Sequence, residues 1–161
     1  MTLQNPYSPP ASRVDDVSPV EESPPLWNPR VAANWSLLFS PVFGALVHMK
    51  NWQALGETEE AAKSKNWAIG SLIFLAFMAL LAAFLPDSKV MDLLTRLTGL
   101  VLLIVWYYAS GKPQYRYVLT KFGTKYKKKG WSKPLLCAIG GLLGFMVVMG
   151  LLGFALGAFA A

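Results

Sequence analysis

The sequence predicts an all-α integral membrane protein with three transmembrane helices and a proline-broken helical hairpin. Three observations lead to this prediction. The 161 residues are 54% hydrophobic and only 15% charged, whereas soluble domains have roughly 25% charged residues. The apolar residues form long uncharged runs. Finally, the formal charge of +6 comes from residues 112–134, which hold eight Lys or Arg and no acid. Because short basic loops beside membrane spans stay in the cytoplasm, this stretch sets the predicted orientation.

Residues 1–30 contain most of the prolines, together with four acids and two arginines. This composition offers too little apolar surface to offset the entropy lost on ordering, so a disordered, proline-rich tail is predicted. The stretch also lacks the apolar core of a cleavable signal peptide, and we expect the first membrane-directed segment to guide insertion.

Residues 31–55 have two interpretations. Residues 31–49 carry no formal charge and are almost long enough to cross a bilayer, which takes about 20 residues. Pro41, however, removes a backbone donor and disfavours helix at Ser40, so a break is expected there. A re-entrant or interfacial hairpin leaves three spans and a cytoplasmic tail. A kinked full span gives four transmembrane helices and an exported tail.

Transmembrane helices are predicted at residues 58–86 and 90–111. The first begins in a polar stretch, where Glu59 and Lys63 lie one turn apart, and continues into an uncharged run of 19 residues. In the second, Asp92 and Arg96 share a face near its start, where we expect a structural ion pair.

Residues 112–134 are predicted to form a cytoplasmic, basic amphipathic segment. Tyr115, Val118, Leu119, Phe122 and Tyr126 recur at helical spacing, which is typical of a helix lying on a membrane surface with its apolar side down. The basic residues around this stripe are expected to bind anionic lipid headgroups, and nucleic acid is not an expected partner. They are Arg116, Lys121, Lys125, Lys127, Lys128, Lys129 and Lys133.

Residues 135–160 are predicted to form a glycine-rich transmembrane helix without a charge. Small residues at four-residue spacing let a second helix approach closely in lipid. We therefore expect this helix to pack against a neighbour, in the same chain, in a second copy or in another membrane protein. The glycines concerned are Gly140, Gly144, Gly150, Gly153 and Gly157.

Motifs for catalysis or cofactor binding are absent from the sequence, and no cofactor or metal is expected. There is no G-x-S-x-G elbow, no phosphate loop and no Cys/His grouping with metal-ligand spacing. His48 is the only histidine, and a satisfied structural role is expected for it. A small channel or transporter subunit is the alternative, because irregular backbone near Pro41, with Asn34 and His48, could line a water-filled path.

Two stretches carry a resemblance. Residues 27–56 (WNPRVAANWSLLFSPVFGALVHMKNWQALG) and 117–135 (YVLTKFGTKYKKKGWSKPL) resemble a group of small, functionally undefined bacterial inner-membrane proteins. The resemblance implies a multi-pass protein of the bacterial inner membrane with a cytoplasmic N-terminus, which favours the hairpin interpretation of residues 31–55. It supplies no catalytic residues. Together these observations predict a non-enzymatic scaffold or interaction subunit that binds anionic lipid through its basic cytoplasmic loop.

Overall fold

The computed structural model describes residues 23–84 and 88–160, so most of the predicted tail lies outside the described residues. The described part is helical. Its elements are α1 (Pro29–Ala54), α2 (Thr58–Phe84), α3 (Lys89–Trp106), the π-helical turn η1 (Tyr107–Gly111), α4 (Lys112–Phe122) and α5 (Ser132–Ala160).

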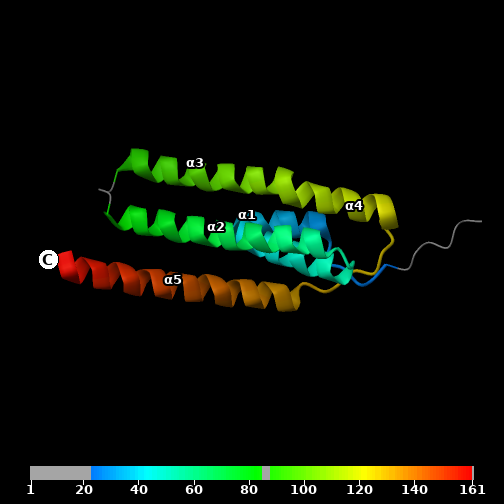
Figure 1. The fold of residues 1–161 in the computed structure, drawn as a ribbon. Helices are drawn as coiled ribbons and strands as arrows, with labels where there is room; N and C mark the ends of the chain where they lie inside the picture. The colour runs from blue at the N-terminus through cyan, green and yellow to red at the C-terminus, as the bar shows by residue number, and fades with distance from the viewer. Residues whose placement is uncertain (1–22, 85–87, 161) are drawn as a thin grey trace, which may run out of the picture.

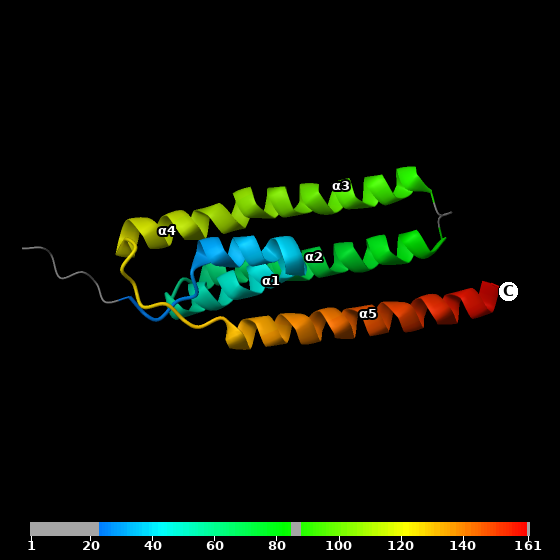
Figure 2. The same cartoon turned by 180° about the vertical axis from the view of Figure 1, so that it is seen from behind.

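The long helices lie side by side in an elongated bundle (Figures 1 and 2). α2 and α5 run in the same direction. α3, which comes between them in the sequence, runs in the opposite direction. α4 prolongs α3 through η1, so the two form one helical rod of 34 residues, Lys89–Phe122. α1 lies only at the end of the bundle that carries α4, and the C-terminus lies at the opposite end.

α1 is folded double at Ser40. Ser40 has φ 75° and ψ 166°, a left-handed value that is rare outside glycine, and Pro41 follows it. The first arm (residues 29–39) and the second arm (residues 41–54) then run antiparallel. Hydrogen bonds join Asn51 to Trp27 and His48 to Pro29, so positions on one arm meet positions on the other in reverse order. The break that Pro41 predicts is present, and it reverses the chain.

Small side chains allow α2 to pack closely against this hairpin. Ala61, Ser64, Ala68 and Ser71 are buried and recur at spacings of three and four residues, so they form one face of α2. Ala68 packs in a cluster with Ala45 and Trp106. This is the close approach between small residues that membrane helices use, and it occurs on α2.

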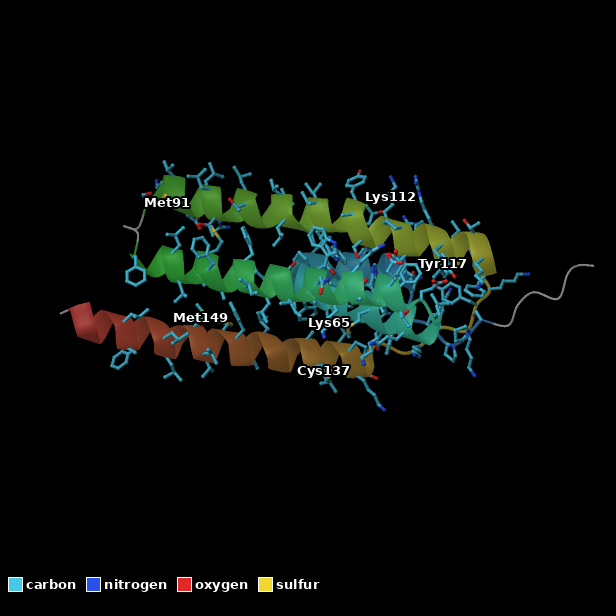
Figure 3. All side chains as sticks on the ribbon, viewed as in Figure 1. Lys65, Met91, Lys112, Tyr117, Cys137 and Met149 are labelled. Carbon is cyan, nitrogen blue, oxygen red and sulfur yellow. The ribbon has the colours of Figure 1, made fainter. Side chains whose placement is uncertain are left out.

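Away from the hairpin, the helices expose large apolar side chains. Ile73, Phe77, Val101, Leu151 and Phe154 are each at least 58% exposed, far more apolar surface than soluble proteins leave in contact with water. Figure 3 shows mostly carbon atoms around Met149, whereas nitrogen and oxygen atoms gather near Lys112 and Tyr117. Among the described residues, four helices are long and apolar enough to cross a membrane: Pro29–Ala54, Thr58–Ala82, Lys89–Phe122 and Ser132–Leu156.

Two expectations need correction. The predicted disordered tail extends too far, because residues 23–28 are placed and Leu26 is fully buried against Val118 and Phe122. The predicted amphipathic helix is too long, because it ends at Phe122, where Gly123 adopts φ 63°. Its apolar side does not lie free for lipid either, since Val118 and Phe122 cover Leu26.

Candidate functional site

Two buried amides fasten the hairpin to α4, and we call Asn51 and Gln114 the amide lock. The Asn51 side chain accepts from Trp27 N at 3.0 Å and donates to Trp27 O at 2.8 Å and to Gln114 Oε1 at 3.1 Å. Gln114 Nε2 donates to the His48 carbonyl oxygen at 2.8 Å. Both amide side chains are fully buried. Each lost bond would leave a buried polar group without a partner, so the lock fixes the hairpin in place.

His48 belongs to the same cluster. Its ring is fully buried, its Nε2 lies 3.2 Å from the Pro29 carbonyl oxygen, and its centroid lies 5.5 Å from that of Trp106. The contact with Pro29 joins the end of one arm to the beginning of the other. His48 therefore packs inside the hairpin as part of this cluster, but its Nδ1 has no hydrogen-bond partner among the described residues, so the ring is only partly satisfied. Asn34, the other polar residue of the channel alternative, is exposed on the first arm.

Trp106 fills the space between the hairpin and the α3–α4 rod. It is fully buried at the end of α3, and a β-carbon added to Gly44 would collide with its ring and with Ser36 Oγ. The hairpin arms and Trp106 can therefore meet only because residue 44 has no side chain.

The turn η1 keeps the α3–α4 rod facing the hairpin. Four buried residues of the rod are separated by multiples of four positions: Trp106, Gln114, Val118 and Phe122. In a regular α-helix of 3.6 residues per turn, residues at this spacing move gradually around the helix and would not all face the hairpin. A π-helical turn contains an extra residue and corrects this drift. Gly111, within the turn, lies near the rings of Trp106 and His48.

The predicted headgroup-binding residues gather at the α4 end of the molecule, and we call them the basic face. They lie on α4, on the connection 123–131 and on the first turn of α5: Arg116, Lys121, Lys125, Lys127, Lys128, Lys129 and Lys133. All are exposed except Lys129, which is half-buried over the Trp27 ring at 4.3 Å from its centroid. Within residues 23–84 and 88–160, ion pairs join only Lys63 to Glu59 and Glu60, and Arg96 to Asp92. The Glu59–Lys63 and Asp92–Arg96 pairs confirm the two predicted from helical spacing.

The segment before α1, residues 23–28, orders the basic connection through an isolated β-bridge between Leu26 and Lys128. Leu26 N donates to Lys127 O at 3.0 Å, Lys129 N donates to Leu26 O at 2.8 Å, and the Trp27 indole donates to Gly130 O at 2.9 Å. Tyr126 packs against the Leu26 cluster. Burial raises the pKa of its hydroxyl, with a further contribution from Tyr115, so it remains a neutral group among the lysines.

The glycines of α5 face open space. A β-carbon added to Gly140, Gly144, Gly150 or Gly153 would meet nothing within 4 Å. Gly157 lies in α5, but its surroundings are outside the described residues. In the described part of this chain, these four glycines therefore have no helix packed against them.

Sequence reasoning did not find the amide lock, Leu26 or Trp106. Gln114 lies in a stretch dominated by lysines and tyrosines, where a single amide gives no signal of burial. Among the described residues, no three His, Cys, Asp or Glu side chains come close enough to hold a metal ion. Comparisons of the chain with protein families, with curated proteins and with solved structures found no match.

Proposed function

We propose that this protein is a non-enzymatic, multi-pass protein of the bacterial inner membrane, a scaffold or interaction subunit that binds anionic lipid headgroups through its basic face. The observation that carries the proposal is the gathering of exposed Lys and Arg side chains at one end of an otherwise apolar bundle. Basic clusters next to membrane spans attract acidic lipid with about 1 kcal/mol per residue. Leu26 forms backbone hydrogen bonds with Lys127 and Lys129, so the lysines of the connection 123–131 are held in a fixed arrangement.

Removing three of these charges tests the headgroup contact. Lys125→Gln/Lys127→Gln/Lys128→Gln is expected to weaken the preference for phosphatidylglycerol over phosphatidylcholine up to about 100-fold at low salt, because three contributions of about 1 kcal/mol are lost. Lipid enrichment around the protein in mixed nanodiscs measures this preference. Lys65→Gln/Lys89→Gln removes charge outside the basic face and is the control. An unchanged preference in the triple variant would refute the proposal.

The proposed topology has three spans and a hairpin that enters only the cytoplasmic leaflet. The arms are roughly 17 and 21 Å long at 1.5 Å per residue, too short to cross a core of about 30 Å. Hydrogen bonds from residues 26 and 27 to the basic connection also support an N-terminus on the cytoplasmic side.

Reporter fusions test this topology. Alkaline phosphatase fused after Ser88 or at the C-terminus is expected to be active, because both sites lie outside. The same reporter at the N-terminus is expected to be inactive, and green fluorescent protein fused there should fluoresce. An exported N-terminus would instead establish four spans.

We also propose that α5 associates with a second copy of the chain through one of its two glycine-bearing sides. Gly140 and Gly144 share one side, and Gly150, Gly153 and Gly157 share another, because Gly144 and Gly153 lie about 180° apart around the helix. Either Gly144→Ile or Gly153→Ile is expected to reduce crosslinked dimer in membranes at least several-fold, because a branched side chain on the contacting side would hold the two backbones apart. The open space around both glycines means that neither change disturbs the single chain. Ala155→Ile, at an exposed position about 160° around the helix from Gly153, is the control for Gly153→Ile. Dimer yields equal to wild type in both variants would exclude association through either glycine-bearing side.

A further inference from the structure

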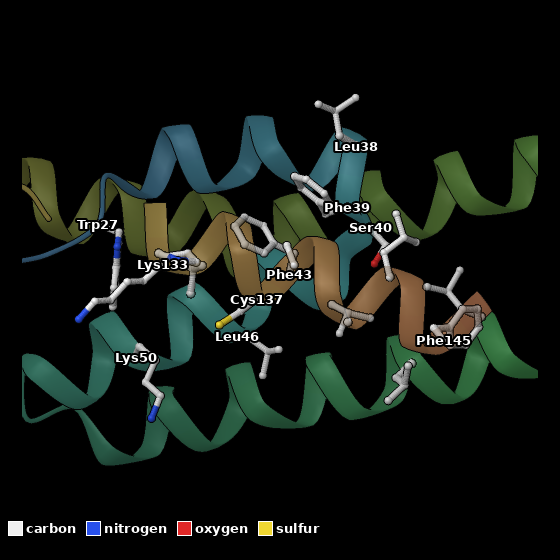
Figure 4. Close-up of a pocket in the computed structure, with 18 residues that line it drawn as sticks. Trp27, Leu38, Phe39, Ser40, Phe43, Leu46, Lys50, Lys133, Cys137 and Phe145 are labelled. Carbon is white, nitrogen blue, oxygen red and sulfur yellow. The ribbon is translucent and has the colours of Figure 1, made fainter. Parts of the chain in front are cut away.

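An apolar groove lies between the hairpin, α2 and α5 (Figure 4). Its volume is about 830 Å³, within the range of roughly 300–1,000 Å³ that small-molecule sites occupy. We call it the hairpin groove. Its walls include Phe43 and Leu46 from the second arm, Leu72 from α2, and Cys137, Leu142 and Phe145 from α5.

The charge in the groove is confined to one end. Lys50 and Lys133 are the only charged residues among the described side chains that line it, and both are exposed. Figure 4 shows them on the same side as Trp27, whereas Leu38, Ser40 and Phe145 lie toward the other end. Neither lysine forms an ion pair with a described acid. The groove is therefore positive at its mouth and apolar along its length.

The depth of the groove corresponds to one leaflet. It follows the hairpin arms from the basic end to the reversal at Ser40. The arms are roughly 17 and 21 Å long, and half of a hydrocarbon core of about 30 Å is about 15 Å. A chain that enters beside the lysines reaches the apolar end without leaving the leaflet.

We propose that the hairpin groove holds one anionic phospholipid of the cytoplasmic leaflet, with its phosphate at Lys50 and Lys133 and an acyl chain along Phe43, Leu46 and Leu142. The inference rests on the proposed membrane placement, and it assigns a discrete site in addition to the basic face. Charge complementarity selects this occupant. A free phosphate compound would leave the apolar walls uncovered, and a zwitterionic lipid would bring a cationic group of its own next to the two ammonium groups.

The only cysteine of the chain reports on this site without any mutation. Cys137 lines the groove and is exposed. In nanodiscs, phosphatidylglycerol is expected to slow alkylation of Cys137 by a membrane-permeant maleimide at least several-fold relative to phosphatidylcholine alone. A cysteine introduced at Val101, on an exposed face of α3, in a Cys137→Ala background serves as the control and should react at the same rate in both lipids. Equal rates at Cys137 would overturn the proposal.

Charge removal locates the phosphate. Lys50→Gln/Lys133→Gln is expected to raise roughly 30-fold the amount of phosphatidylglycerol needed for half-maximal protection of Cys137, since two contributions near the headgroup are lost. Lys65→Gln should leave protection unchanged. Three outcomes would assign the groove to another occupant. Protection could persist in the double variant, it could depend on protein density rather than on lipid, or it could disappear when residues 1–22 are deleted.

The two lipid proposals can fail separately. If Lys125→Gln/Lys127→Gln/Lys128→Gln leaves general enrichment unchanged while Lys50→Gln/Lys133→Gln abolishes protection, the groove stands and the basic face fails. The reverse result removes the groove alone.

Discussion

Asn51→Leu is expected to lower the free energy of unfolding by about 3 kcal/mol. Leucine has the same branching at Cγ but forms none of the three hydrogen bonds that Asn51 makes with Trp27 and Gln114. The buried groups left behind lose their partners, at roughly 1–3 kcal/mol for each. Thermal unfolding in detergent, followed by near-ultraviolet circular dichroism of the tryptophans, measures the loss.

A double-mutant cycle separates the amide lock from general damage. Gln114→Leu alone should also destabilise the protein. Asn51→Leu/Gln114→Leu should cost less than the sum of the two, because both substitutions break the same bond. Gln53→Leu, at an exposed position two residues further on, is the control. If Asn51→Leu and Gln53→Leu unfold at the same temperature, the amide lock does not stabilise the hairpin.

Gly44→Ala is expected to cost at least about 3 kcal/mol, the upper part of the range for overpacking. The added methyl group would overlap the Trp106 ring and Ser36 Oγ, and Trp106 is fully buried. The same unfolding measurement applies. Gly70→Ala is the matched control, since a β-carbon there meets nothing within 4 Å, and helix propensity predicts up to about 1 kcal/mol of stabilisation.

A smaller side chain at position 106 tests whether contact with Trp106 causes the destabilisation by Gly44→Ala. Trp106→Leu should itself destabilise the protein, but in that background Gly44→Ala should cost much less than in wild type. If Gly44→Ala costs the same in both backgrounds, the loss does not arise from contact with Trp106.

Local patterns predict much of this fold because they depend on neighbours in the sequence. Uncharged runs predict the long helices, and Pro41 predicts the break in α1. Spacing of four residues predicts the ion pairs of Lys63 and Arg96. For a membrane protein these signals are strong, because an apolar environment forces backbone groups to pair within each helix.

Contacts between distant residues could not be predicted in the same way. Asn51 and Gln114 are 63 residues apart, and each looks like an ordinary polar residue at a membrane surface. Leu26 follows two prolines and precedes Trp27, outside any periodic apolar run, so no local pattern indicates that it enters a core. In the sequence, the small residues that predict close helix packing are the glycines of α5. The close packing occurs instead on α2, through Ala61, Ser64, Ala68 and Ser71. Two of these residues lie in the polar beginning of α2 and two in its apolar run, so their common spacing is not apparent in the sequence.

The hydrogen bond between Trp27 and Gly130 spans 103 residues, which imposes an order on biosynthesis. At roughly 5–20 residues per second, a ribosome needs about 5–20 s to extend the chain from one partner to the other. During that interval the hairpin has been made, but the segments that hold it, from Gln114 to Gly130, do not yet exist. The last third of the protein therefore completes the first, and a nascent chain stalled before residue 114 is expected to be degraded by membrane proteases faster than the finished molecule.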